Sequence, residues 1–438
     1  MNIKFVLLGL SLFLILKVQG QTVLSAQDAV ELALENNYGI KIAKNSVEIA
    51  ENNANVLNSG FLPRLTGSGG AVHNIDNTKA TYSNDSTATL NGAESSRYNA
   101  SINLNYTLFD GLGRQYNYKK LKEEQQLSEL EARETIENTI LQLFTVYYNV
   151  AQLSENTRAL KQTLNISKER LTRANYQFDY GQSTKLGVLN AQVDINNDSI
   201  NVINAFQRLK NAKRDLNVVL GNALINNFEV DTLVAFVLQL DKTDLLEKVK
   251  ASNVILLQLE KNLHISEYTL KTWKSDYLPT LGLTGTYGWN KNDNNAASFL
   301  AGSTSTGLSA GINLSWNLFD GGSTITRVKN AQIDLENQKL QKEQIIMEVE
   351  RDFNNAWDDY QNKLTIFYVQ EENILTAKNN FDRTQEKFRL GQVTSIEFRQ
   401  AQLNLLSAEL SRNQAKYEAK LAELFVLQLS GELLNVNF

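Results

Sequence analysis

The chain has 438 residues, a formal net charge of −5 and no cysteine. The absence of cysteine excludes disulfides, thiol catalysis and cysteine-ligated metals. The negative net charge gives no indication of a nucleic-acid-binding surface. The sequence has two histidines, His73 and His264, which lie far apart and which we interpret as ordinary surface or packing residues. Its two prolines leave room for very long uninterrupted helices.

Residues 1–20 have the pattern of a secretory signal peptide. Lys4 is followed by an apolar run over 5–16 and then by Gly20, a small residue suited to cleavage. An uncleaved membrane anchor is the alternative, but such a short apolar run cannot span a bilayer as a helix. We therefore expect an exported protein without a transmembrane helix.

A first repeat is predicted over residues 21–221. Its opening helix starts with a capping box formed by Ser25 and Asp28, and it stops shortly before Pro63. The predicted elements that follow are strands at about 65–75 and 97–109, the exposed polar loop 75–96 between them, a long helix at 111–178 and a return helix at 184–220.

A second repeat, over 242–431, copies the first at a distance of 210 residues. In both copies Leu-Phe-Asp-Gly ends a strand and places Asp110 or Asp320 to cap the next helix. The repeats are joined by an irregular link, 222–241, which we assign to a small equatorial region. The remaining predicted elements are an opening helix, strands at about 281–290 and 307–319, the polar loop 290–307, a long helix at 321–388, a return helix at 394–430 and a short tail at 432–438.

The two strands that precede Leu-Phe-Asp-Gly alternate strictly between apolar and small polar residues. A period of two over about eleven residues indicates one apolar and one polar face, and this length suits an outer-membrane strand. A half-buried strand of a soluble sheet is the alternative, but the duplication favours the membrane strand. The residues expected to face lipid are Tyr98, Ile102, Leu104, Tyr106, Ile312, Leu314 and Trp316.

Each predicted long helix continues for about 65 residues, or roughly 100 Å, without a proline or glycine. Apolar residues recur at every seventh position, with Thr157 the one polar exception. A period of 3.5 residues indicates left-handed coiled-coil packing. The heptad positions are Ile136, Leu143, Val150, Leu164, Leu171 and Phe178 in the first copy and Ile346, Phe353, Tyr360, Phe367, Ile374, Phe381 and Phe388 in the second.

Four membrane strands in one chain require partners. They cannot close a barrel, and lipid tolerates no open sheet edge. We therefore expect a dimer with eight strands or a trimer with twelve. Because each strand adjoins a long helix, the barrel should continue as a helical tube, and a tube that is open along its axis is a conduit.

With these features the sequence resembles the TolC-like outer-membrane efflux protein family over about residues 22–435. The resemblance rests on the order and spacing of Leu24-Ser25, the Leu-Pro junctions at Pro63 and Pro279, and the duplicated Leu-Phe-Asp-Gly and Phe-x-x-Gly-Gln sequences. It implies an α+β membrane protein, a homotrimer whose twelve-stranded outer-membrane β-barrel continues as a periplasmic α-helical coiled-coil tunnel. It also implies a passive export channel that docks to a periplasmic adaptor (membrane fusion) protein and to an inner-membrane efflux pump or secretion transporter.

In that family the turns at the ends of the long helices form the periplasmic tip that meets the adaptor. A plain helix-hairpin turn explains the same residues, and both interpretations can hold. Family members also narrow the tunnel near the tip, often with acidic residues, and Asp382 resembles such a gate; a solvated helix-face aspartate is the alternative. The tip residues that match are Phe178, Gly181, Gln182, Ser183, Thr184, Phe388, Gly391, Gln392 and Thr394.

The competing hypothesis is a periplasmic or surface coiled-coil scaffold or adhesin. It explains the signal peptide and the heptads but not the four strands between helices. An enzyme is disfavoured, because the sequence has no Gly-x-Ser-x-Gly, no His-Glu-x-x-His and no phosphate-binding glycine loop. We expect no catalytic residue, cofactor or metal site and no nucleic-acid partner.

Overall fold

The computed structural model describes residues 22–224, 228–237 and 240–435. The predicted signal peptide lies outside the described residues. The chain forms two compact units, and each unit takes segments from both sequence repeats. The sheet unit comprises Ser46–Leu130 and Gln258–Gln344, and the remaining described residues form the helical unit.

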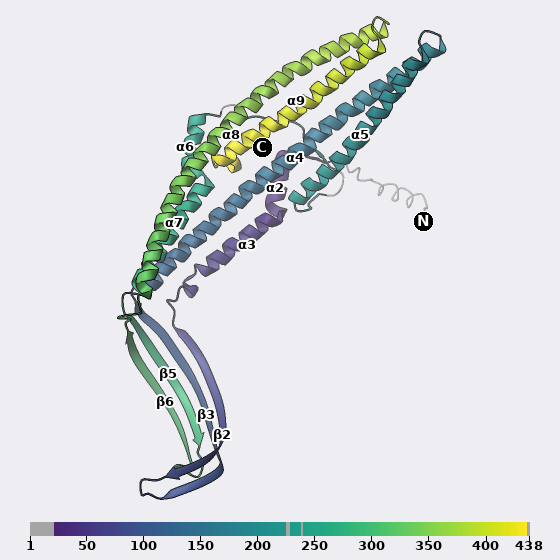
Figure 1. Ribbon diagram of the computed structural model, residues 1–438. Helices are drawn as coiled ribbons and strands as arrows, with labels where there is room; N and C mark the ends of the chain where they lie inside the picture. Colours follow the sequence, from purple (N-terminus) through teal and green to yellow (C-terminus); the bar gives the residue numbers. More distant parts are fainter. Residues whose placement is uncertain (1–21, 225–227, 238–239, 436–438) are drawn as a thin grey trace, which may run out of the picture. The chain divides into compact units, whose positions relative to one another are not determined.

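The sheet unit contains a four-stranded antiparallel sheet in the order β2-β3-β5-β6 (Figure 1). Each repeat supplies one hairpin, and β3 pairs with β5 to join the two hairpins. The two strands of each hairpin overlap the ranges expected from the sequence. The strands are β2 (Arg64–Thr81), β3 (Thr87–Asp110), β5 (Thr280–Asp293) and β6 (Gly302–Ser315).

Five strand boundaries differ from the sequence prediction by more than one residue. The loop predicted at 75–96 is largely strand, because its Asn, Ser and Thr backbones continue the ladder as far as the pair Thr81↔Thr87. The loop predicted at 290–307 is shortened in the same way by β5 and β6. The strand predicted at 307–319 ends at Ser315, and the Trp316 indole Nε1 donates a hydrogen bond to the Tyr277 carbonyl at 3.1 Å.

The two faces of the sheet have opposite chemistry. Residues that pair directly across strands share a face, and one such row consists of Tyr106, Leu283 and Ile312. On the other face the Thr286 hydroxyl donates to the side-chain oxygen of Asn103 at 3.0 Å. The alternation read from the sequence thus extends across neighbouring strands as one apolar and one hydrogen-bonded polar face.

Helices form most of the rest of the fold. Among the described residues, no helix is both long enough and apolar enough to cross a membrane. Asp110 and Asp320 cap the long helices as predicted, since Asp110 accepts from the Arg114 amide at 3.0 Å and Asp320 from the Thr324 amide at 2.8 Å. The helices are α2 (Ala26–Asn36), α3 (Tyr38–Asn53), α4 (Gly113–Asp179), α5 (Lys185–Val219), α6 (Lys242–Ser252), α7 (Val254–Ser275), α8 (Ser323–Arg389) and α9 (Ser395–Leu429).

The opening helix of each repeat is broken, which the sequence analysis did not predict. Asn37 separates α2 from α3 and Asn253 separates α6 from α7, each with an extended backbone. Each asparagine amide donates to the end of a return helix, Asn37 to the Val219 carbonyl at 2.8 Å and Asn253 to the Leu429 carbonyl at 2.9 Å. The breaks therefore satisfy carbonyls that a helix terminus leaves without a partner.

The helical unit consists mainly of two antiparallel hairpins, α4 with α5 and α8 with α9 (Figure 1). Most of the predicted heptad positions lie in its packing: Leu143 and Phe353 are fully buried, and Tyr360 and Phe381 nearly so, whereas Phe178 at the end of α4 is exposed. Burial raises the pKa of Tyr360 to about 12. The 3.5-residue pattern thus marked the packed side of each long helix correctly.

The link between the repeats is held by charged side chains of α9. Lys420 donates to the Ala235 carbonyl at 2.7 Å, Lys416 donates to the Thr232 carbonyl at 3.2 Å, and Glu423 accepts from the Val237 amide at 3.2 Å. Burial raises the pKa of Glu423 although Lys420 lies 2.5 Å away. The link is also not wholly irregular, because β4 (Phe228–Val230) pairs in parallel with β1 (Thr22–Leu24).

Candidate docking site at the hairpin tips

Both hairpins of the helical unit turn through the same backbone motif. Gly181 and Gly391 have φ values of +70° and +74°, in the left-handed region that favours glycine. The Gly181 amide donates to the Phe178 carbonyl at 2.9 Å and the Gln182 amide to the Gln177 carbonyl at 2.7 Å, which together form a Schellman motif. The corresponding bonds at Gly391 and Gln392 measure 3.1 and 2.8 Å.

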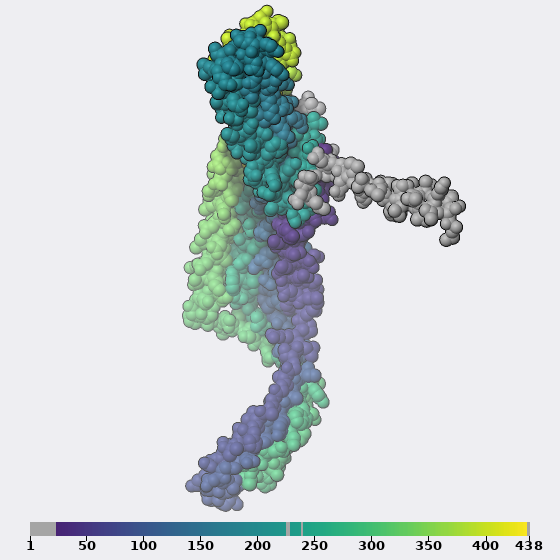
Figure 2. Space-filling view, turned by 90° about the vertical axis from the view of Figure 1, so that its right-hand side faces the viewer, coloured from purple at the N-terminus to yellow at the C-terminus, as the bar shows by residue number. Residues whose placement is uncertain are grey.

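The two turns lie side by side at one end of the helical unit (Figures 1 and 2). Arg173 of the first hairpin joins them, because its guanidinium donates to the Arg389 carbonyl at 2.9 Å and lies 5.0 Å from the centre of the Phe388 ring. The predicted tip residues are mostly exposed, while Ser183 and Phe388 are half-buried. The structure thus brings together two segments that are 210 residues apart in the sequence.

The return helices start differently. Thr394 caps α9 with the predicted capping box: its hydroxyl accepts from the Glu397 amide at 3.2 Å, and the Glu397 carboxylate accepts from the Thr394 amide at 2.7 Å. These hydrogen bonds hold the pKa of Glu397 below its usual range. Thr184 is the N-cap of α5 but makes no side-chain capping bond. The first turn of α5 is therefore the less secured of the two.

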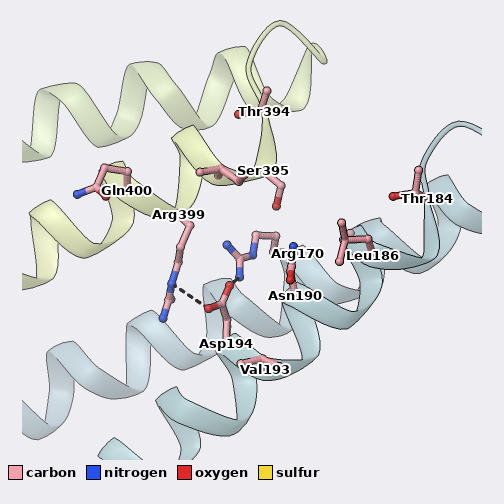
Figure 3. Close-up of a pocket in the computed structure, with 12 residues that line it drawn as sticks. Arg170, Thr184, Leu186, Asn190, Val193, Asp194, Thr394, Ser395, Arg399 and Gln400 are labelled. Atoms are coloured by element: carbon pink, nitrogen blue, oxygen red, sulfur yellow. Dashed lines mark hydrogen bonds and ion pairs between the residues drawn. The ribbon is translucent and has the colours of Figure 1, made fainter.

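A cleft of about 480 Å³ separates the two hairpins near the turns (Figure 3). Its rim carries the apolar side chains of Leu186 and Ile396, both exposed. Arg170, Asp194 and Arg399 come from α4, α5 and α9 and point toward one another in its floor. An open cleft with an apolar rim and a charged floor suits contact with a side chain of another protein.

The charges beneath the cleft form a buried network that the sequence analysis missed. Arg399 donates to both carboxylate oxygens of Asp198 at 2.8 Å, and Ser167 donates to Asp198 at 2.6 Å. Arg170 pairs with Asp194, and the Nε atoms of Arg170 and Arg399 are buried without a hydrogen-bond partner among the described residues. No sequence signal identified this network, because each of these charged residues has the pattern of an ordinary solvated residue on a helix surface.

Asp382, the predicted gate residue, lies on α8 and is exposed. It does not line the cleft, and its neighbour Phe381 is the residue that packs inward, against Phe398. The predicted lipid-facing residues belong to the sheet unit, where Ile312 and Leu314 are strongly exposed in the chain. The tip residues and Asp382 belong to the helical unit, and the strand residues belong to the sheet unit.

Residues of the described segments offer no group of histidine, aspartate and glutamate side chains that could hold a metal ion. What the structure presents instead is a sheet with an apolar face, two coiled-coil hairpins and a paired tip. Its backbone matches that of outer-membrane channels: the CmeC channel of Campylobacter jejuni has a TM-score of 0.77 at 17% identity, covering 93% of this chain and 86% of that one. The CusC channel has a TM-score of 0.75 at 14% identity, covering 94% and 93%. The fold is that of an outer-membrane channel with a helical tunnel.

The chain belongs to the outer membrane efflux protein family, whose sequence profile matches residues 29–222 and 245–432. Curated relatives include the outer membrane efflux protein BepC of Brucella suis, 22% identical over 94% of this chain and 87% of that protein. The outer membrane protein TolC of Escherichia coli is 22% identical over 81% of this chain and 73% of that protein. The protein is thus an outer-membrane component of efflux or secretion, as the resemblance implied.

Proposed function

We propose that three copies of this protein close a twelve-stranded barrel in the outer membrane, continued by a helical tunnel in the periplasm. The observation that carries the proposal is the four-stranded sheet with one apolar face, in which β2 and β6 each have only one partner strand in the part of the chain that the structure describes. Lipid tolerates no unpaired strand edge, so further strands must come from other copies. The family resemblance favours three copies over two.

The mass of the detergent-solubilised complex tests this proposal. We expect a trimer that needs detergent to stay in solution. The competing hypothesis of a coiled-coil scaffold or adhesin predicts a protein that is soluble without detergent. A monomer, or a stable dimer with eight strands, would overturn the trimer.

The orientation of the sheet has its own test. Ile312 should face lipid and its neighbour Asn313 the lumen, as the opposite chemistry of the two faces suggests. Ile312→Arg at mid-bilayer should cost about 2–4 kcal/mol, whereas Asn313→Arg should be milder. The yield of assembled complex in the outer membrane measures both, and equal losses would contradict the assignment.

The channel should serve as a passive duct that docks to a periplasmic adaptor and an inner-membrane pump or secretion transporter. One relative, AprF of Pseudomonas aeruginosa, is named as an alkaline protease secretion protein and is 21% identical over 93% of this chain, which supports a role in such an export system. The paired turns offer the docking site, because they end helices of 67 residues and expose Phe178, Gln182 and Gln392. Helices of roughly 100 Å suit a tip that reaches a periplasmic partner.

Substituting the turn glycines tests docking apart from assembly. An added Cβ at Gly181 or Gly391 meets nothing within 4 Å, although the left-handed φ is strained for other residues. Gly181→Leu or Gly391→Leu should therefore leave normal amounts of trimer but abolish export. Photo-crosslinkers at Gln182 or Gln392 should capture the adaptor in the wild type and not in these variants. Normal export by both variants, or loss of the trimer itself, would refute the docking role.

Asp382 is the candidate gate residue of the proposed channel. Three exposed Asp382 carboxylates that converge in a narrow aqueous tunnel would attract cations, because like charges in a poorly screened channel focus the field. Asp382→Ala should change single-channel conductance or cation selectivity in planar bilayers while the trimer persists. An unchanged single-channel record would show that Asp382 is only a solvated helix residue.

A further inference from the structure

The polar face of the sheet carries positive charge and no negative charge between Arg64 and Arg97. Arg64 pairs directly with Asn105, and Arg97 pairs with Val72 and Asn292. Every second residue of a strand lies on the same face, so positions 97, 99, 101, 103 and 105 of β3 mark the rows of paired residues that connect the two arginines. Besides the two arginines, these rows contain only asparagine, serine, threonine, glycine and Val72.

Neither arginine has a counter-charge. Both side chains are exposed, and no ion pair of the described residues includes either one. The Arg97 Nε donates a hydrogen bond to the side-chain oxygen of Asn292, a neutral neighbour on the same face, at 3.2 Å. This bond holds the guanidinium in place and leaves its charge unbalanced.

The nearest acidic residues on this face lie outside the stretch. Asp76 of β2 lies two rows beyond Arg97, and Asp110 of β3 lies two rows beyond Arg64. Asp110 is already paired with Arg114 at 2.9 Å. Exposed protein surfaces usually mix both signs of charge, so a stretch with cations alone produces a positive potential.

The other face of the same strands does not repeat this pattern. Its cation near Arg97 is Lys291, which pairs directly with Tyr98. The Lys291 ammonium lies 3.3 Å from the Asp293 carboxylate, so this charge is balanced within one strand. The unbalanced charge is therefore on the polar face.

We propose that the barrel lumen attracts anions and that its preferred cargo carries carboxylate, sulfate or phosphate groups. This inference rests on the proposed trimer, whose three copies place Arg64 and Arg97 in two rings with an uncharged polar lining between them. The two rings lie eight residues apart along β3, or about 27 Å. Cations that line a channel with low-dielectric walls raise the local concentration of anions, which favours their entry.

The positive barrel and the candidate gate at Asp382 act on different ions. Asp382 belongs to the helical unit, whereas both arginines belong to the sheet unit. The current through the whole channel depends on both regions. A test of the barrel must therefore measure the local potential between the two arginine rings.

A thiol between the rings reports that potential, since the natural chain has no cysteine. Ser101 lies midway, four residues along β3 from each arginine row. The full-length Ser101→Cys variant, purified as the detergent-solubilised complex, is treated with sulfonatoethyl methanethiosulfonate, which is anionic, and separately with the cationic trimethylammonioethyl methanethiosulfonate. The ratio of the two rates, compared between variants, cancels the intrinsic reactivity of the thiol. At about 10 mM salt, where charges act over about 30 Å, adding Arg64→Gln or Arg97→Gln should lower the anion-to-cation rate ratio about threefold or more, and about 1 M salt should remove the difference.

Two further variants control the experiment. Arg97→Lys keeps the charge and should keep the ratio, whereas Lys291→Gln removes a cation from the other face and should change the ratio less. An unchanged ratio in both arginine-to-glutamine variants, or an equal loss in Lys291→Gln, would overturn the anion-attracting lumen and leave the channel itself intact. Ser101→Cys that reacts with neither reagent would instead show that the polar face is not the aqueous lumen, and a complex with the mass of one chain would refute the trimer.

Discussion

The turns at 178–184 and 388–394 have the same backbone but are held by different side chains. In the second turn Phe388 stacks on Phe398 with ring centroids 4.6 Å apart and planes within 5° of parallel. In the first, Phe178 is exposed, and the Lys185 ammonium lies 5.1 Å from its ring centre. Glycine and helix-end hydrogen bonds are enough to define the turn, while its rigidity depends on what packs behind it.

The comparison extends to the first turns of the return helices. Phe398 and Arg399 of α9 correspond to Val188 and Leu189 of α5. Of these two helices, only α9 has a complete capping box. The second tip should therefore be the more rigid one. This difference can be tested one position at a time, each with its repeat equivalent as the matched control.

The largest difference should come from Arg399→Leu. It leaves the Asp198 carboxylate, which is 3% exposed, without its bidentate partner, and breaking a buried pair typically costs about 3–5 kcal/mol. The converse change Leu189→Arg alters an exposed residue and should stay within about 0.5 kcal/mol. Denaturant unfolding in detergent, followed by circular dichroism, measures both. Equal losses would show that the network does not hold the second hairpin.

Phe398→Ala should have the next largest effect. The ring is buried between Phe381 and Phe388, and truncating a buried phenylalanine costs about 3 kcal/mol or more. Val188→Ala removes fewer buried atoms at the equivalent position and should cost less. Protease cleavage rates at the two turns report the local effect, and faster cleavage at the first turn in Phe398→Ala would contradict the assignment.

Thr394→Ala should act more weakly and only at the start of α9. Loss of an N-cap side chain costs about 1 kcal/mol, whereas Thr184 makes no capping bond whose loss could matter. Amide hydrogen exchange in the first turn of each return helix distinguishes the two. Similar increases in Thr394→Ala and Thr184→Ala would mean that Thr184 also caps its helix in solution.

Elements defined by local rules could be predicted from the sequence. Heptad spacing identified the packed faces of the long helices, period-two alternation identified the carboxyl-terminal parts of β3 and β6, and glycine marked both turns. The capping boxes at Ser25 and Thr394 followed from residues three positions apart. In each case the information lies within a few residues of the element.

Features that depend on distant partners could not be predicted. Asn37 and Asn253 break helices because their amides reach carbonyls of α5 and α9. The polar residues after position 75 form strand because a second polar segment pairs with them. The network around Asp198 needs α4, α5 and α9 together. None of these contacts leaves a periodic signal in the sequence.

The smallest expected difference is a pH response confined to the second tip. Hydrogen bonds from the Thr394 amide and hydroxyl lower the pKa of Glu397 below its usual value near 4.5. The capping box therefore stabilises α9 fully above that usual value. This stabilisation is lost as the pH falls through the lowered pKa of the folded state. The first turn of α5 has no acidic residue and should not respond. Hydrogen exchange, corrected for its intrinsic pH dependence, should therefore show fraying of the first turn of α9 below pH about 4.5. Glu397→Gln should remove this response, and an equal response in α5 would show that acid loosens both tips by another route.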